Sequence, residues 1–247
     1  MGGWRFLVPN SFTAASAVLA VVSVVLSLEG RLELAAWMAL WCVLLDKADG
    51  SAARLLKASS EFGLQFDSMA DLIAFGLAPA VLTYCTGRQA WGIAFGDPFH
   101  WVLASCAVLY VLMAAVRLAR FNVRAVSEPS ARYFEGVTTT LCGGIVCTAL
   151  LVGAKWGWPV QVARYFPLVL VLLGLSMVSR IPLPKIVSRR SRAFNVFQLV
   201  AAGGIYVCGV LMILPEYLLA LALFYLLVGS TYGLLRGPAR AGAKDAG

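Results

Sequence analysis

The stretch that decides the fold is Asp46–Asp71, which reads DKADGSAARLLKASSEFGLQFDSMAD. Four of its side chains are aspartates, and apolar runs such as Trp37–Leu45 and Leu72–Tyr84 lie directly before and after it. A carboxylate at membrane depth costs about 2.5–3.5 kcal/mol on insertion scales. Four carboxylates in an otherwise apolar region therefore need a compensating partner, and a metal cation is the simplest one.

The rest of the chain has the composition of an integral membrane protein. Of its 247 residues, 61% are hydrophobic and only 13% are charged, whereas a soluble domain has about 25% charged residues. A membrane-spanning helix needs about 20 mainly apolar residues. The sequence predicts eight such spans, near Phe12–Leu28, Leu32–Leu56, Gly63–Cys85, His100–Val123, Val137–Ala154, Phe166–Val178, Phe194–Leu214 and Pro215–Leu235.

We therefore expect an all-α fold, a polytopic bundle of membrane helices that forms one domain over residues 1–236. Residues 237–247 are small and polar, and we expect a disordered cytoplasmic tail there. A count of seven spans stays open, because the sixth segment is short and only Leu214-Pro215-Glu216 separates the last two.

The basic residues predict the orientation of the bundle in the membrane. Under the eight-span assignment, 16 of the 20 Lys and Arg residues fall on one side. Basic residues collect in cytoplasmic loops, so we expect both termini and the Asp46–Asp71 stretch to face the cytoplasm of a cell membrane. The four basic residues on the opposite side are Arg31, Arg88, Lys155 and Arg164.

The aspartates fall into two stripes at helical spacing, since residues three and four apart share a helix face. Two consecutive helices with a short turn between them pack as antiparallel neighbours, so the four carboxylates can converge near the cytoplasmic end of the pair. The first stripe consists of Asp46, Asp49, Gly50 and Ala53, and the second of Gly63, Asp67, Ala70 and Asp71.

Carboxylate oxygens select hard cations such as Mg²⁺, Mn²⁺ or Ca²⁺. Four of them suffice for two cations that share ligands, an arrangement suited to phosphoryl transfer. Gly50, Ala53 and Gly63 leave room for a bulky anionic ligand, and Arg54 offers a fork of donors for a phosphate oxygen. With one histidine, His100, and no Cys-x-x-Cys pair, the chain does not have the residues of a His-based zinc site.

The order Asp46-x-x-Asp49-Gly50-x-x-Ala53-Arg54, eight residues, then Gly63-x-x-x-Asp67-x-x-x-Asp71 resembles the signature of the CDP-alcohol phosphatidyltransferases. All eight specified positions and every spacing match. The resemblance implies a multi-helix membrane enzyme, commonly a homodimer, that transfers a phosphatidyl group from a CDP-linked lipid to an alcohol and releases CMP. It also implies Mg²⁺ or Mn²⁺ as cofactor, and no nucleic-acid partner.

Carried over by position, the resemblance assigns a role to each residue of the motif. Asp46, Asp49, Asp67 and Asp71 would bind two divalent cations, and Asp71 would also take the proton of the acceptor hydroxyl. The cytidine diphosphate site would be lined by Gly50, Ala53, Arg54 and Gly63, with Asn10 and Thr13 of the first helix nearby.

Other stretches resemble the phosphatidylserine synthase branch of that family, which implies CDP-diacylglycerol as donor and L-serine as acceptor. Arg117 and Arg120 lie three apart, at the predicted cytoplasmic end of the fourth span, with Asn122 just beyond. An arginine fork can hold a serine carboxylate, so these three residues are candidates for acceptor binding. Arginines also collect at cytoplasmic helix ends for topological reasons alone. The matching stretches are Phe66–Asp71, Phe75–Ala80, Arg117–Asn122, Tyr133–Gly136 and Met177–Pro182.

Two alternatives stay open at this point. The branch usually continues after Gly136 with a proline-containing run of small residues, whereas this chain has Val137-Thr138-Thr139-Thr140. The acceptor could therefore be another alcohol, such as glycerol phosphate, inositol phosphate or choline. Membrane carboxylates are also found in cation-coupled transporters, although the chain shows no internal repeat of the kind common in them.

Overall fold

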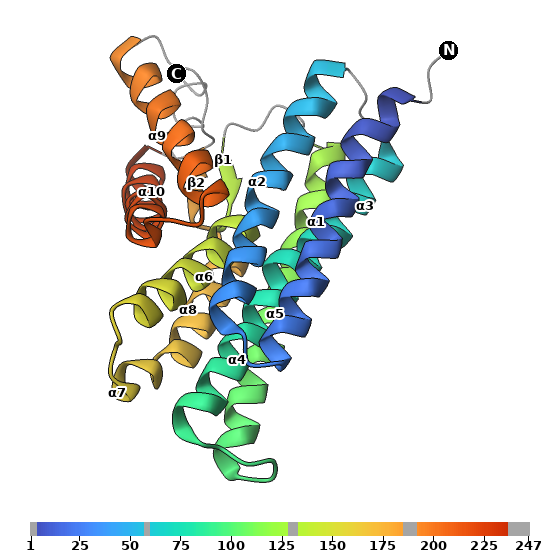
Figure 1. The fold of residues 1–247 in the computed structure, drawn as a ribbon. Coiled ribbons are helices and arrows are strands. Elements are labelled where there is room, and N and C mark those ends of the chain that lie inside the picture. The colour runs from blue at the N-terminus through green and yellow to red at the C-terminus, as the bar shows by residue number, and fades with distance from the viewer. Residues whose placement is uncertain (1–3, 57–59, 128–132, 185–191, 237–247) are drawn as a thin grey trace.

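The computed structural model describes the chain except for residues 1–3, 57–59, 128–132, 185–191 and 237–247 (Figure 1). The predicted tail therefore lies outside the described residues. The helices are α1 (Trp4–Leu28), α2 (Leu32–Leu56), α3 (Glu61–Asp71), α4 (Ala78–Trp91), α5 (Pro98–Ser127), α6 (Thr139–Lys155), α7 (Val160–Ala163), α8 (Phe166–Val178), α9 (Arg192–Val210) and α10 (Pro215–Arg236). A π-helical stretch, η1 (Leu72–Leu77), joins α3 to α4, and the strands are β1 (Tyr133–Glu135) and β2 (Pro182–Pro184).

The fold is nearly all-α, as predicted, and each of the eight predicted segments is helical. Among the residues that the structure describes, five helices are long and apolar enough to cross a membrane, which makes the chain a multi-pass membrane protein. The α2 helix is not among them, since it carries Glu33, Asp46, Lys47 and Asp49. The five are Phe6–Leu28, Glu61–Trp91, Pro98–Arg124, Gln161–Val178 and Pro215–Leu235, and shorter apolar helices cover Thr139–Lys155 and Gln198–Val210. The count of eight spans stays a prediction.

The first two helices form an antiparallel hairpin, and Figure 1 shows them side by side along their length. The hydroxyl of Ser23, on α1, donates to the carbonyl of Ala35, on α2, at 2.7 Å. The thiol of Cys42 donates to the Ser16 carbonyl at 3.3 Å. Both contacts join buried side chains to backbone across the helix interface, so they fix how far α1 is shifted along α2.

The stretch α3–η1–α4 is continuous, and its π-helical part follows directly after Asp71. The buried Tyr110, on α5, donates its hydroxyl to the Phe75 carbonyl at 3.0 Å. On the other side, Gly143 lets α6 approach closely, because a Cβ there would lie 3.1 Å from the Phe75 Cα. Short π-helical stretches within α-helices are frequent at functional sites. Here Tyr110 of α5 and the close approach of α6 at Gly143 hold η1 in place.

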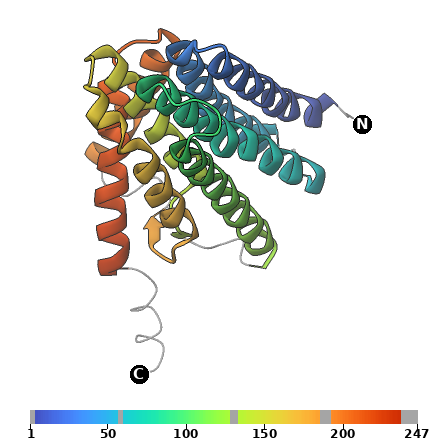
Figure 2. The same cartoon turned by 90° about the horizontal axis from the view of Figure 1, so that it is seen from below.

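The two short strands are the one departure from an all-α fold in the described part of the chain. β1 pairs antiparallel with β2, with Phe134 opposite Leu183. The pair ties the segment before α6 to the segment after α8, and Tyr225, on α10, donates to the Pro184 carbonyl at 2.8 Å. Figure 2 shows α10 at one flank of the bundle and α1 at the other.

Candidate active site

Three of the four predicted aspartates come together at one point. Asp46 and Asp49, from the C-terminal half of α2, and Asp67, from α3, each place a carboxylate oxygen within 4.8 Å of the others. Asp49 is buried, and the other two are half-buried. The helical spacing seen in the sequence produces this cluster because α2 and α3 are consecutive helices whose aspartate faces meet.

Two neighbouring side chains contact this three-aspartate cluster. The hydroxyl of Thr13, on α1, donates to Asp49 Oδ2 at 2.9 Å. Lys47 Nζ lies 3.5 Å from Asp46 Oδ2, but the lysine side chain is 65% exposed. An exposed lysine contributes little to such a pair, so Lys47 does not compensate three clustered carboxylates.

The donor set fits a divalent cation. Oxygen ligands lie about 2.0–2.6 Å from Mg²⁺ or Ca²⁺, so two oxygens bound to one cation are separated by at most about 4–5 Å. The carboxylate oxygens of the cluster satisfy this limit. All three donors are carboxylates, the ligand type that Mg²⁺ and Mn²⁺ prefer. The structure thus has an acidic cluster able to bind a metal.

Asp71, the fourth predicted ligand, does not belong to the group of three, but its charge interacts with theirs. It is one helical turn after Asp67 and interacts with Asp46 and Asp67 through its charge. The positive charge that faces it is the guanidinium of Arg117, on α5. The charge of Asp71 thus interacts both with the acidic cluster and with a buried arginine.

Arg117 is the most buried of the predicted acceptor residues, with 8% of its surface exposed. Its Nη1 donates to the hydroxyl of Thr139 at 3.2 Å, and its Nε is buried without a hydrogen-bond partner among the described residues. Buried polar groups are nearly always hydrogen-bonded. The Nε–H of Arg117 is thus a buried donor that lacks a partner in the described part of the chain.

The other two predicted acceptor residues make contacts within the protein. Arg120 Nη1 donates to the Val178 carbonyl at 2.7 Å, and its Nη2 lies 3.5 Å from Glu135 Oε2. Asn122 accepts from the hydroxyl of Ser68 at 2.9 Å, and its amide donates to Gln65 at 3.2 Å. Arg120 thus links α5 to β1 and to the end of α8, and Asn122 links α5 to α3.

The predicted CDP-lipid residues come from α1, α2 and the start of α3. Ser60 caps this helix and accepts from the Gly63 N–H at 3.0 Å. A Cβ at Gly63 would lie 3.1 Å from Ser60 Oγ and 3.4 Å from Asn10 Oδ1, so the amide of Asn10 is directly beside this glycine. Gly50 and Ala53 are half-buried on α2. Arg54 is on the last turn of α2, and its side chain lies outside the described residues.

Three contacts could not be read from the motif. Thr13 was placed by the sequence near the CDP-lipid, and in the structure its hydroxyl is bonded to Asp49. Thr139, in the segment that departs from the usual branch pattern, accepts from Arg117. Ser60 has the signal of a helix cap, a serine followed by an acidic residue and a helix, but nothing in the sequence shows that the Asn10 amide lies beside Gly63.

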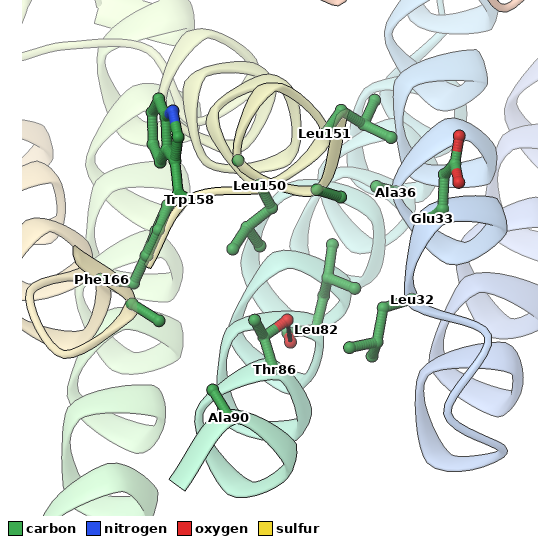
Figure 3. Close-up of a pocket in the computed structure, with 13 residues that line it drawn as sticks. Leu32, Glu33, Ala36, Leu82, Thr86, Ala90, Leu150, Leu151, Trp158 and Phe166 are labelled. Carbon is green, nitrogen blue, oxygen red and sulfur yellow. Dashed lines mark hydrogen bonds between the residues drawn. The ribbon is translucent and has the colours of Figure 1, made fainter. Parts of the chain in front are cut away.

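A separate cavity of about 190 Å³ lies at the opposite end of α2 from the aspartates (Figure 3). Leu32 and Ala36 of α2, Leu82 of α4, Leu150 of α6 and Phe166 of α8 contribute to its walls. Glu33 is the only acidic residue among its lining residues. The cavity contains no aspartate, so it is distinct from the candidate active site.

Comparison with known proteins shows to which family the chain belongs. A model of the family described as CDP-alcohol phosphatidyltransferase matches residues 6–181, a region that contains Asn10, all four aspartates and Arg117. The chain belongs to the CDP-alcohol phosphatidyltransferase family. It is therefore a membrane transferase of phospholipid biosynthesis, and the transporter alternative is set aside.

Relatives of this chain include several enzymes named CDP-diacylglycerol–serine O-phosphatidyltransferase. The Helicobacter pylori J99 protein is 34% identical over 181 residues, which cover 72% of each chain. The Mycobacterium leprae protein is 32% identical over 189 residues, covering 72% of this chain and 58% of that one. The Bacillus subtilis protein is 34% identical over 144 residues, covering 57% of this chain and 68% of that one.

Proposed function

We propose that this phosphatidyltransferase transfers the phosphatidyl group of CDP-diacylglycerol to L-serine, giving phosphatidylserine and CMP, with Mg²⁺ or Mn²⁺ as cofactor. The observation that carries the proposal is the convergence of Asp46, Asp49 and Asp67 within 4.8 Å, in a chain of this family. The serine acceptor is supported by relatives named for that reaction and by the buried Arg117.

Asp46, Asp49 and Asp67 would hold the cation, and Asp71 would complete the set for a second one. Bound cations of this type neutralise the charge of a diphosphate and of the leaving phosphate. The protein holds the carboxylates in place before the substrate binds, so little reorganisation is needed at the moment of reaction. Packing of α1 and α2 and the capped start of α3 supply that rigidity.

The cytidine diphosphate would lie beside Gly50, Ala53 and Gly63, where the absence of large side chains lets it approach the backbone. The Asn10 amide, next to Gly63, offers both a donor and an acceptor to the nucleotide. Arg54, at the end of α2, is our candidate for a phosphate oxygen. The acyl chains of the donor would stay in the lipid between helices.

The acceptor would bind between Arg117 and Asp71. Arg117 Nε has no partner among the described residues and would donate to the serine carboxylate, while Thr139 holds the other end of the guanidinium. Asp71 interacts with the charge of Arg117, and in our proposal an amino acid held by the arginine would present its hydroxyl to the Asp71 carboxylate.

In the reaction, the serine hydroxyl oxygen forms a bond to the phosphorus that bears diacylglycerol. The bond between that phosphorus and the bridging oxygen of CMP breaks, and CMP leaves with the electron pair. Asp71 accepts the hydroxyl proton. Attack is direct and in line, so no phosphatidyl-enzyme intermediate forms. The catalytic contribution of the protein is positioning and charge neutralisation.

The placement in the membrane follows from the charge pattern of the sequence. We propose that eight helices span the cell membrane, that both termini are cytoplasmic and that the aspartate cluster lies at the cytoplasmic side, where CTP-derived nucleotides and serine are present. We also propose a homodimer, as is common in the family.

The test is CMP release by detergent-purified protein supplied with CDP-diacylglycerol and Mn²⁺, in the presence of one alcohol at a time. We expect serine-dependent CMP release and an equal amount of phosphatidylserine. Release with glycerol phosphate, inositol phosphate or choline, and not with serine, would overturn the acceptor assignment and leave the phosphatidyl transfer intact. No release with any alcohol would contradict the proposed activity.

A further inference from the structure

We propose that Thr13 is a positioning residue of the metal centre, which holds the carboxylate of Asp49 in the orientation that binds a cation. The inference rests on the metal site of the proposed function. It gives Thr13 a different role from the nucleotide contact that the family resemblance implies, and the hydrogen bond from the Thr13 hydroxyl to Asp49 carries it.

Thr13 has the environment of a residue that supports a ligand and does not touch the substrate. Only 4% of its surface is exposed, and Asp49 is 7% exposed. The Thr13 hydroxyl lies 2.9 Å from Asp49 Oδ2 and 3.2 Å from the Pro9 carbonyl in its own helix. A hydroxyl has one proton, and a charged acceptor makes the stronger hydrogen bond. The proton therefore goes to Asp49.

This hydrogen bond fixes one oxygen of the carboxylate and leaves the other for the cation. Without it, the Asp49 carboxylate keeps only the contact with the Gly50 backbone N–H, and the like charges of Asp46 and Asp67 favour its rotation away from the centre of the cluster. Partners that orient a metal ligand in this way typically contribute about 10- to 100-fold to metal affinity.

The helix hairpin around Thr13 does not depend on this hydrogen bond. The contact from Cys42 to the Ser16 carbonyl and the contact from Ser23 to the Ala35 carbonyl hold α1 and α2 in register further along the interface. Replacing Thr13 with valine keeps the shape and volume and removes only the hydroxyl. The effect should therefore appear in the carboxylate and not in the position of the helix.

The experiment is a Mn²⁺ titration of the full chain in detergent, in which the electron paramagnetic resonance signal of free Mn²⁺ reports binding. The variants are Thr13→Val, which loses the hydroxyl, and Thr13→Ser, which keeps it. Ser23→Ala is the matched control, since it removes a hydroxyl from the same α1–α2 interface far from the aspartates. Thermal unfolding is measured for each, and Thr13→Ala replaces Thr13→Val if the latter does not purify.

We expect Thr13→Val to raise the Mn²⁺ Kd about 10-fold or more, with Thr13→Ser and Ser23→Ala within about threefold of wild type. CMP release by Thr13→Val should need correspondingly more Mn²⁺ and recover when Mn²⁺ is saturating. An unchanged Kd in Thr13→Val, with Mn²⁺ bound normally by wild type, would overturn the inference and leave the proposed function standing. Failure of the wild-type protein to bind Mn²⁺ would instead overturn the proposed metal site itself.

Discussion

Replacing Arg117 with lysine should weaken serine binding without affecting the donor lipid. The guanidinium is buried, donates through Nη1 to Thr139 at 3.2 Å and faces the charges of Asp71 and Asp46. Lysine keeps the positive charge, so the two aspartates retain a cation nearby. It loses the planar fork that can bind a carboxylate and Thr139 at the same time.

The size of the effect follows from the hydrogen bonds that are lost. A hydrogen bond to a charged group contributes about 1.5–3 kcal/mol, and each 1.4 kcal/mol is about a tenfold change in affinity. We therefore expect the KM for serine to rise about 10- to 150-fold in Arg117→Lys. The KM for CDP-diacylglycerol should stay within about twofold, because the predicted nucleotide residues are on α1, α2 and α3. Steady-state CMP release at varied serine and varied donor measures both constants.

Arg120→Lys is the matched control, one turn further along the same helix. Its guanidinium is bonded to the Val178 carbonyl and lies near Glu135, so its replacement should lower the unfolding temperature and leave the serine KM nearly unchanged. The acceptor assignment would be wrong if Arg117→Lys had a normal serine KM, or if both variants raised it equally.

Two further predictions concern the scaffold and the proton transfer. Gly143→Ala should destabilise the protein by about 1–3 kcal/mol, because the new Cβ would lie 3.1 Å from the Phe75 Cα. Gly144→Ala, whose Cβ would have no atom within 4 Å, should have little effect. Thermal unfolding in detergent compares the two variants, and equal stabilities would show that α6 is free to move away from η1. Asp71→Asn should lower kcat about 10²- to 10⁴-fold, which is the usual contribution of a general base. CMP release at saturating serine measures kcat, and a normal value would show that Asp71 is not the base.

The sequence was sufficient to predict the helices and most of the aspartate cluster. Long apolar runs are the signal of membrane helices, and the predicted segments Leu32–Leu56 and Phe166–Val178 coincide with α2 and α8. The three- and four-residue spacing puts Asp46 and Asp49 on one helix face. Because α3 follows α2 closely in the chain, Asp67 can then reach them.

What the sequence did not show depends on contacts between residues far apart in the chain. The π-helical stretch after Asp71 has an ordinary apolar sequence and is held by Tyr110 and Gly143 from other helices. The β1–β2 pair joins Phe134 to Leu183 although α6, α7 and α8 lie between the two strands in the chain, and no hairpin signal precedes it. Arg117 and Arg120 look equivalent in sequence, and only their neighbours in the structure distinguish them, since Arg117 donates to Thr139 and Arg120 lies beside Glu135.

The most direct test of the metal-dependent transfer is the comparison of wild type with Asp67→Asn in Mn²⁺-dependent, serine-dependent CMP release. Asparagine has the same shape and removes one of the three clustered charges. Losing one metal ligand should cost several kcal/mol of transition-state stabilisation, so we predict that release falls at least about 10³-fold. The unfolding temperature in metal-free buffer should be unchanged or higher, since like charges no longer repel. Near-normal CMP release by folded Asp67→Asn, at the same Mn²⁺ concentration, would contradict the assignment of this cluster as the active site.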